Sequence, residues 1–453
     1  MGRVGSAVAA RAGLLAGPRL VRDCPQPLTA LLLRRMWRLP GDAFGVACRV
    51  RLALCQDRGV VETSRLDGAD GWRAVAVAFA AMSTTFGIAY SFGAFLLPIS
   101  EDLGAGRGAT AGVFSLTTVA LFGLGGLSGP AVDRFGPRRV LLIGAVSLGA
   151  GLILMSRATS LWHAYLGHGV GVGLAVACAY VPLVAVVGGW FERRRTLAVG
   201  VAVSGIGLGT LVGAPIAAAL VERVGWRDAY LLLGGVGVVV LLVSAVFVRA
   251  AGAVTGAAHV PLRPRLRQPE FLRLYAAGLL LSVALFVPFV HLPSYAQADG
   301  VGSVAAATLV GVIGAASVAG RLALGGLAAR AGTLRTYQGC FALMAVSFAV
   351  WMVSPGYVGL VVFALLLGIG YGGFVALGPP LVAETFGVHG LGGLLGVLYT
   401  SAALGSAVGP PVAGVLISST GSYDLSIAAS LAATTIALGI VLTVGRTRRA
   451  AIH

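Results

Sequence analysis

Twelve long apolar runs are the feature that most constrains how this chain can fold. Each is long enough to cross the roughly 30 Å hydrocarbon core of a bilayer as a helix that rises about 1.5 Å per residue. Because a backbone inside a bilayer must satisfy its own hydrogen bonds, the runs predict an all-α integral membrane protein with twelve transmembrane helices. They lie at residues 74–98, 109–132, 138–157, 161–189, 196–221, 226–249, 271–297, 303–329, 335–354, 356–383, 389–418 and 422–445.

Composition excludes the main alternatives to a membrane protein. Hydrophobic residues make up 57% of the chain and charged residues only 11%, whereas soluble domains carry about 25% charged residues. The net charge of +17 does not indicate a nucleic-acid partner, because the arginines stand between apolar runs rather than on a soluble basic surface. We therefore expect a lipid bilayer as the surroundings and no nucleic acid as a partner.

A polar break at residues 250–270 divides the runs into six and six. The predicted domains are a six-helix bundle at 71–249, a cytoplasmic linker at 250–270, a second six-helix bundle at 271–445, and a cytoplasmic tail at 446–453. Residues 1–70 contain no run that could span a membrane. They are read as a poorly ordered cytoplasmic tail, an Arg-rich targeting segment, or sequence translated from upstream of the true start, and we favour the last.

The distribution of arginine predicts the topology. The connections after helices 2, 4, 6, 8 and 10, together with the C-terminus, hold sixteen arginines, and the connections on the other side hold four. Since basic residues accumulate in cytoplasmic loops, both termini are expected in the cytoplasm of a multi-pass protein of the cell membrane.

The two halves resemble each other weakly. The segment GGLSGPAVDRFGPRR (Gly125–Arg139) covers the last part of helix 2 and the loop after it. The segment RLALGGLAARAGTLR (Arg321–Arg335) covers the last part of helix 8 and the loop after it. Superposing Arg134 on Arg330 also superposes Gly136 on Gly332. Such repeats build secondary transporters, whose site lies at the midplane between two pseudo-symmetric halves.

A charged loop after helix 2 is a candidate cytoplasmic gate. Asp133 ends helix 2, Arg134 and Gly136 form the turn, and Arg138 and Arg139 open helix 3. A carboxylate that faces a helix N-terminus and nearby arginines can hold two helices together and release them when the halves move. The alternative, a positive-inside anchor, accounts for the arginines but leaves Asp133 and Gly136 unexplained. The string resembles the loop between helices 2 and 3 of the major facilitator superfamily.

A second segment, WFERRRTLAVGVAVSGIGLG (Trp190–Gly209), joins a basic cluster to a helix with glycines spaced by four. Gly205, Gly209 and Gly213 share one face, which allows a neighbouring backbone to approach closely. The segment resembles the helix 4 to 5 signature of the monocarboxylate transporter family within the major facilitator superfamily. Three other regions agree with that resemblance, namely DGADGWRAVAVAF (Asp67–Phe79), FVPFVHLPSYA (Phe286–Ala296) and GPPVAGVLISSTGSYD (Gly409–Asp424).

Arg321 is the principal candidate for binding substrate. It is the only charge well inside an expected span, where an arginine costs roughly 2.5–3.5 kcal/mol unless it faces a cavity or a partner. Helices 7 to 12 offer no midplane carboxylate to pair with it, so an ion pair that serves only packing is disfavoured. A guanidinium facing an aqueous cavity suits a carboxylate, and the resemblance also places the family's substrate-binding arginine at Arg321.

Tyrosines and one histidine complete the candidate site. Tyr90, Tyr371 and Tyr399 lie within spans and carry hydroxyls that need partners when buried, and Tyr180 is placed similarly. His291 is a candidate for proton coupling because its pKa ordinarily lies near neutrality. Pro182, Pro288, Pro379 and Pro380 are expected to interrupt helices 4, 7 and 10.

The resemblance is incomplete where protons are concerned. Animal members of the family carry an aspartate one turn before the substrate-binding arginine and a lysine on helix 1. Here those positions read Ser317 and Tyr90. The proton must therefore ride on another group, or the substrate exchanges for a second anion.

Enzyme chemistry is not expected, since the sequence contains no phosphate loop, no metal-ligand spacing and no paired interfacial carboxylates. No cofactor and no metal are predicted. The sequence favours a secondary transporter of small monocarboxylates such as lactate or pyruvate, coupled to protons. Alternatives are a carboxylate exchanger of the oxalate and formate kind, an exporter of organic anions or drugs, and a transporter-like membrane sensor.

Overall fold

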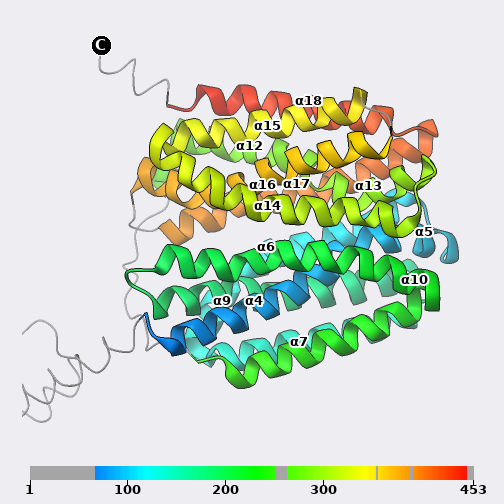
Figure 1. The fold of residues 1–453 in the computed structure, drawn as a ribbon, viewed down its shortest axis with the longest axis horizontal. Coiled ribbons are helices and arrows are strands. Elements are labelled where there is room, and N and C mark those ends of the chain that lie inside the picture. The colour runs from blue at the N-terminus through cyan, green and yellow to red at the C-terminus, as the bar shows by residue number, and fades with distance from the viewer. Residues whose placement is uncertain (1–66, 250–262, 354–355, 388–390, 446–453) are drawn as a thin grey trace, which may run out of the picture. The chain divides into compact units, whose positions relative to one another are not determined.

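A computed structural model describes residues 67–249, 263–353, 356–387 and 391–445, and every element in these ranges is helical. The expectations for residues 1–66, for most of the linker at 250–270 and for the tail at 446–453 fall outside the described residues. The described chain forms one unit. Figure 1 shows its N-terminal half, coloured blue to green, beside its C-terminal half, coloured yellow-green to red.

The N-terminal half contains the first six spans. Helix 1 is broken at Ser91 into two segments, and helix 4 contains one stretch of π-helix, η1. The elements are α4 (Ala69–Tyr90), α5 (Phe92–Asp102), α6 (Arg107–Phe135), α7 (Pro137–Ser156), α8 (Leu161–Ala164), η1 (Tyr165–Val172), α9 (Gly173–Trp190) and α10 (Arg195–Phe247).

Although α10 runs for 53 residues, it is two helices. A straight helix of that length would measure about 80 Å, far more than the roughly 30 Å of a bilayer core. Gly225 interrupts it with φ 80° and ψ 162°, a left-handed conformation that suits glycine. The eleven apolar helices long enough to span among the described residues therefore make twelve crossings, which fits the predicted fold.

The C-terminal half contains the other six spans. A short helix precedes them, and helix 7 is broken at Phe286 as helix 1 is at Ser91. The elements are α11 (Arg263–Leu266), α12 (Pro269–Leu285), α13 (Val287–Ala298), α14 (Ser303–Ala331), α15 (Thr333–Val353), α16 (Tyr357–Phe386), α17 (Leu391–Thr420) and α18 (Asp424–Thr443).

The internal repeat seen in the sequence is also a repeat of structure. The shift that carries Arg134 onto Arg330 carries all 29 residues of α6 onto the 29 residues of α14. It also carries Gly136 onto Gly332, and both glycines end their helices with positive φ, 78° and 91°. The second helix of each half therefore has the same length and ends in the same kind of glycine turn.

Glycines let helices cross at backbone contact in both halves. A Cβ on Gly209 would meet the carbonyl oxygen of Ser83 in α4, and a Cβ on Gly213 would meet that of Gly87. The predicted face of α10 is thus the one that packs closely. At the repeat-related place in the second half, Gly409 of α17 meets the backbone of Val283 in α12.

Of the three helices that proline was expected to interrupt, only helix 7 is broken at its proline. Pro182 lies inside continuous α9, and Pro379 and Pro380 lie inside continuous α16. Helix 7 does break beside Pro288, which occupies the first turn of α13. Helix 1, in contrast, breaks at Ser91 with no proline there. A proline removes one hydrogen bond of a helix, and packing of the whole span can keep the helix running through that loss.

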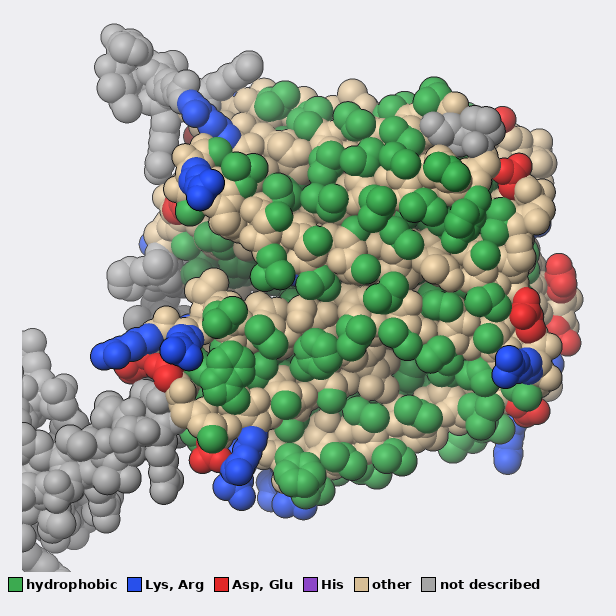
Figure 2. Space-filling view, viewed as in Figure 1, with side chains coloured by type: hydrophobic (Ala, Val, Ile, Leu, Met, Phe, Trp, Pro, Cys, Tyr) green, Lys and Arg blue, Asp and Glu red, His purple; other side chains and the backbone are tan. Residues whose placement is uncertain are grey.

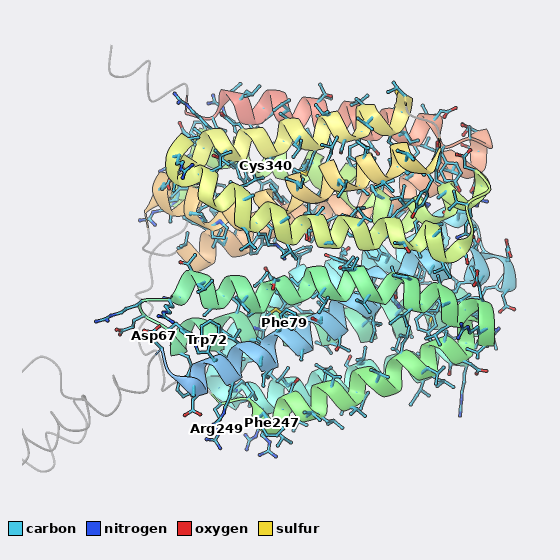
Figure 3. The ribbon with its side chains drawn as sticks, viewed as in Figure 1. Asp67, Trp72, Phe79, Phe247, Arg249 and Cys340 are labelled. Carbon is cyan, nitrogen blue, oxygen red and sulfur yellow. The ribbon has the colours of Figure 1, made fainter. Side chains whose placement is uncertain are left out.

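The outer surface is that of a membrane protein. Large apolar side chains are exposed on the sides of the bundle, for example Val146 at 70% and Val358 at 78%. Figure 2 shows apolar side chains over this face and charged side chains at its two ends. The end on the left in Figures 1 and 3 holds Asp67, labelled in Figure 3, with Arg193 and Arg194 bonded to it, and the turn between α14 and α15 that precedes Arg335. It is here called the basic end, and the other is called the opposite end.

Candidate functional site

A cavity lies between the two halves near the middle of the bundle. About 70 Å³ of it is open to the centre of a water molecule, room for on the order of five waters or a carboxylate of a few carbon atoms. Both halves line it, with Phe86, Tyr90, Leu121, Phe122, Tyr180 and Ile206 from the first and Leu274, Gly278, Ser282, Leu285, Phe286, Arg321, Tyr337, Tyr371, Phe374, Val375, Gly378, Leu395, Leu398, Tyr399, Ser401 and Ala402 from the second.

Arg321 brings the only charged side chain to this cavity among the described residues that line it. It projects from the middle of α14, and its Nη1 donates to the carbonyl oxygen of Val203 in α10, 3.0 Å away. Its Nε and Nη2 are buried and make no hydrogen bond to any described residue. The guanidinium therefore connects the two halves. Because buried polar groups ordinarily have hydrogen-bond partners, its two unpartnered nitrogens are candidate donors to a bound anion.

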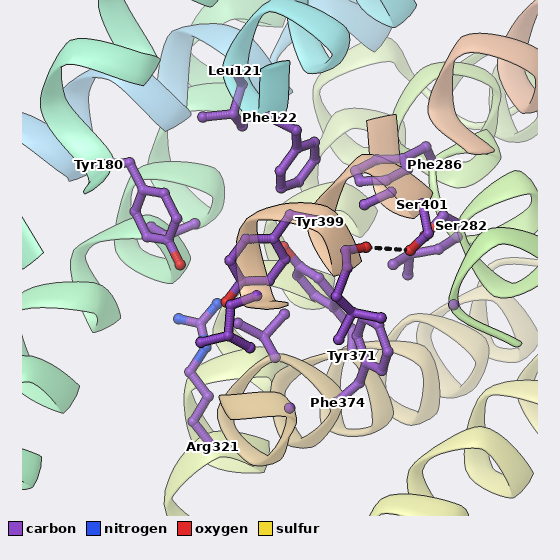
Figure 4. A pocket seen from close by; sticks show the side chains of 18 of the residues that line it. Leu121, Phe122, Tyr180, Ser282, Phe286, Arg321, Tyr371, Phe374, Tyr399 and Ser401 are labelled. Carbon is purple, nitrogen blue, oxygen red and sulfur yellow. Dashed lines mark hydrogen bonds between the residues drawn. The ribbon is translucent and has the colours of Figure 1, made fainter. Parts of the chain in front are cut away.

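Tyrosine hydroxyls surround the guanidinium. The hydroxyls of Tyr90 and Tyr180 both interact electrostatically with the guanidinium of Arg321, and the hydroxyl of Tyr90 also interacts with that of Tyr371. Figure 4 shows Tyr180 and Tyr399 pointing their hydroxyls towards Arg321 from different walls of the cavity. The four predicted substrate-binding residues, Arg321, Tyr90, Tyr371 and Tyr399, thus line one cavity.

Sequence reasoning missed part of the lining. The hydroxyl of Ser282, on α12, is buried without a partner among the described residues, and Tyr337 enters the cavity from α15. Neither carries a signal in the sequence, because serine and tyrosine are common in spanning helices. Tyr180 also lines the cavity, and it carries the same signal in the sequence as the other tyrosines, a hydroxyl within a span. The remaining wall consists largely of aromatic and aliphatic side chains.

The cavity is closed towards the opposite end by contacts between the halves, which meet along α6 with α17 and α10 with α14. Ser115 donates to the carbonyl oxygen of Ser406 at 2.6 Å, and Thr118 donates to its hydroxyl at 2.7 Å. Arg107, at the start of α6, donates to the hydroxyl of Tyr423 at 3.1 Å. Towards the basic end the surface between the halves is hollowed (Figure 2).

His291 lies outside the cavity. Its side chain is buried in α13, and its Nε2 is 2.8 Å from the carbonyl oxygen of Pro410 in α17. Because a carbonyl only accepts, Nε2 carries the proton, and Nδ1 is left buried without a partner among the described residues. The structure thus gives His291 a free proton acceptor but does not bring it to Arg321.

The predicted gate residues lie at the basic end. Gly136 makes the turn between α6 and α7, and Arg134, Arg138 and Arg139 are exposed. None of these arginines forms a salt bridge with a residue that the structure describes, and Arg134 lies over the ring of Phe135. The side chain of Asp133 is outside the described part of the chain, so the predicted latch between helices 2 and 3 stays a prediction.

Two segments that were noted separately in the sequence meet at the basic end. Asp67 accepts hydrogen bonds from the backbone N–H groups of Arg193 and Arg194, both at 3.2 Å. Its own N–H donates to the carbonyl oxygen of Trp190, and the indole Nε1 of Trp190 donates to the carbonyl oxygen of Arg249. The aromatic pair and basic cluster thus hold the start of α4 and the end of α10 together.

The chain also matches the sequences of known proteins. A sequence model of the Major Facilitator Superfamily matches residues 77–357. Monocarboxylate transporter 3 of Rattus norvegicus is 32% identical over 377 residues, which cover 79% of this chain and 76% of the relative. Monocarboxylate transporter 12 of Xenopus laevis is 28% identical (82% and 87% covered), and monocarboxylate transporter 13 of Bos taurus is 29% identical (83% and 90% covered).

Proposed function

Because the chain belongs to the major facilitator superfamily, as a monocarboxylate transporter-like member, we propose that it moves a small monocarboxylate of the lactate or pyruvate kind by alternating access. The family makes the chain a transporter rather than an enzyme. The observation that carries the proposal is Arg321, a cation in a central cavity with two buried donors that have no described partner. A carboxylate can accept both.

Substrate binding and movement are linked in this mechanism. Arg321 of the second half bonds to Val203 of the first, so the halves cannot separate at this point without breaking that bond. A bound carboxylate neutralises the guanidinium and replaces the lost bond. It therefore lowers the free energy of a closed, dry intermediate relative to the same intermediate without substrate.

The state described is open towards the basic end, which we assign to the cytoplasm. The assignment rests on the excess of arginine in the loops at this end, and it places both termini in the cytoplasm of a cell-membrane protein. The gate of Asp133, Arg134, Gly136, Arg138 and Arg139 would then act in the state that is closed at this end.

Proton coupling through His291 and exchange for a counter-anion are the two candidate modes. The free Nδ1 of His291 favours the first. The second is favoured by the cavity itself, because no carboxylate and no histidine stands among the described residues that line it. Uptake driven by an acid gradient and lost in His291→Gln would support coupling. Uptake that needs internal anion and ignores the gradient would support exchange.

The proposal is tested by uptake of radiolabelled lactate, pyruvate and larger carboxylates into proteoliposomes. We expect Arg321→Ala to abolish uptake, and Arg321→Lys to retain little of it, because an ammonium cannot offer the same fork of donors. Both proteins should melt cooperatively and elute as the unmodified protein does. Normal uptake of the preferred carboxylate by folded Arg321→Ala would refute the proposal.

A further inference from the structure

A second hollow lies far from the central cavity, between α4 and the end of α10 at the basic end. About 660 Å³ of it is open to the centre of a water molecule, and none of its lining residues lines the central cavity. The lining residues are Asp70, Arg73, Ala74, Ala76, Val77 and Ala80 from α4, and Val243, Ser244, Val246, Phe247 and Arg249 from α10 and its end.

The groove faces the membrane. Val243, Val246 and Phe247 are all more than half exposed, with Phe247 at 64%, and they stand on a helix that spans the bilayer. The facing wall of α4 consists of small side chains such as Ala76 and Ala80, which leave room beside it. From Asp70 to Ala80 the groove follows α4 for about 15 Å, the thickness of one leaflet.

One end of the groove is cationic. Arg73 pairs with Asp70 at 2.9 Å but stays exposed, and the side chain of Arg249 makes no hydrogen bond or ion pair with a described residue. The charged side chains that line the groove therefore sum to one positive charge. Figure 3 shows Arg249 and Phe247 together near the start of α4, on the outer side of the bundle.

The cationic end is held in place by the contacts around Trp190. The backbone of Arg249 is fixed because its carbonyl oxygen accepts from the Trp190 indole at 2.8 Å. The start of α4 is fixed because Asp67 bonds to the same tryptophan and Trp72 packs edge-on against Phe191 at 5.4 Å. Arg73 on α4 and Arg249, two residues beyond the end of α10, are thus kept at one end of an apolar channel.

We propose that this groove is a binding site for one anionic phospholipid of the leaflet at the basic end. Its phosphate and anionic headgroup contact Arg249 and Arg73, and one acyl chain lies along Ala76, Ala80, Val243 and Phe247. A cationic end and an apolar floor match an anionic amphiphile in both chemistry and length. The site is independent of the carboxylate cavity, so it stands whichever substrate is carried.

Native mass spectrometry of the purified full chain, titrated with phosphatidylglycerol or with phosphatidylcholine of the same acyl chains, tests the proposal. We expect one phosphatidylglycerol to bind in preference to phosphatidylcholine. Arg249→Gln should weaken phosphatidylglycerol binding about fivefold, the factor for one basic contact near an anionic surface, and leave phosphatidylcholine unchanged. Ala76→Phe should weaken the binding of both lipids by filling the groove.

Matched controls lie outside the groove. Arg335→Gln removes an exposed arginine at the same end, and Ala429→Phe enlarges an exposed alanine on α18; neither should change lipid binding. Equal binding of the two lipids, or binding unaffected by Arg249→Gln and Ala76→Phe in folded protein, overturns the proposal. A lipid-free dimer that Ala76→Phe dissociates also overturns it, because the groove would then be an interface between two copies.

Discussion

Single side chains perform two different tasks at the two ends of α4. Tyr90, at its far end, faces the cavity and Arg321. Asp67, just before its start, is the only described non-glycine residue with positive φ, at 60°, a conformation that aspartate tolerates better than most residues. This backbone turn aims the carboxylate at the N–H groups of Arg193 and Arg194.

Asp67 should make the stability of the protein depend on pH. Some loss of solvent raises the pKa of its carboxyl, but hydrogen bonds from the amides of Arg193, Arg194 and Glu192 and the charge of Arg193 outweigh this and lower it below 3.8. A lowered folded-state pKa stabilises the protein above the unfolded pKa, and this contribution is lost as pH falls through the folded pKa.

We therefore expect Asp67→Asn to melt at a lower temperature than the unmodified protein at neutral pH. The difference should shrink as the pH falls below 3.8 and through the lowered folded-state pKa of Asp67, because below that pKa both proteins are uncharged at this position. Thermal melting in one detergent across a pH series measures it. Asparagine tolerates the same backbone conformation, so a constant difference at every pH would show that the charge is not responsible.

At the scale of elements, α4 and α10 cross closely because certain glycines lack a Cβ, whereas other glycines on α10 have open space beside them. Gly209 faces the backbone of α4, and a backbone oxygen cannot move aside as a flexible side chain can. Gly200 lies on the same helix with no atom within 4 Å of a Cβ placed there. Because both positions lie on α10 and differ in packing, they form a matched pair for substitution by alanine.

Gly209→Ala should destabilise the protein by roughly 1–3 kcal/mol, the usual range for overpacking. Gly200→Ala should instead stabilise it by up to about 1 kcal/mol, because alanine is the better helix former. Thermal melting of both variants under identical conditions measures the contrast. The crossing described for α4 and α10 would be contradicted if the two substitutions had the same effect.

At the scale of the whole molecule, polar contacts between the halves, on the side of the cavity towards the opposite end, hold the state that is open towards the basic end. Ser406 of the second half receives bonds from both Ser115 and Thr118 of the first. These bonds must break when the cavity opens the other way. Losing one hydrogen bond of about 1 kcal/mol should shift the ratio of the two states about fivefold.

Accessibility measures this shift. With the five native cysteines replaced by alanine, Ser401→Cys places one thiol in the cavity lining. A membrane-impermeant reagent should label it from the basic end and scarcely from the opposite end. Adding Thr118→Val should raise labelling from the opposite end by up to about fivefold. Equal labelling from both ends in the parent would contradict the closure described here.

The order of residues along the chain is enough to predict the spans, the division into halves and a substrate-binding role for Arg321. Apolar length, the repeat that relates Arg134 to Arg330 and the isolation of Arg321 are all properties of neighbours along the chain. For that reason local sequence predicts both the break between 221 and 226, found at Gly225, and the packing face of Gly205, Gly209 and Gly213.

Which residues meet depends instead on the tertiary structure. Spanning helices here are apolar nearly all round, so their periodicity does not say which face turns to the cavity and which to lipid. Only the packed bundle brings Arg321 to Val203, adds Ser282 and Tyr337 to the cavity, keeps His291 out of it, and joins Asp67 to Arg249 through Trp190. Those contacts depend on helix rotation and crossing, which arise from many weak contacts between distant segments rather than from local sequence.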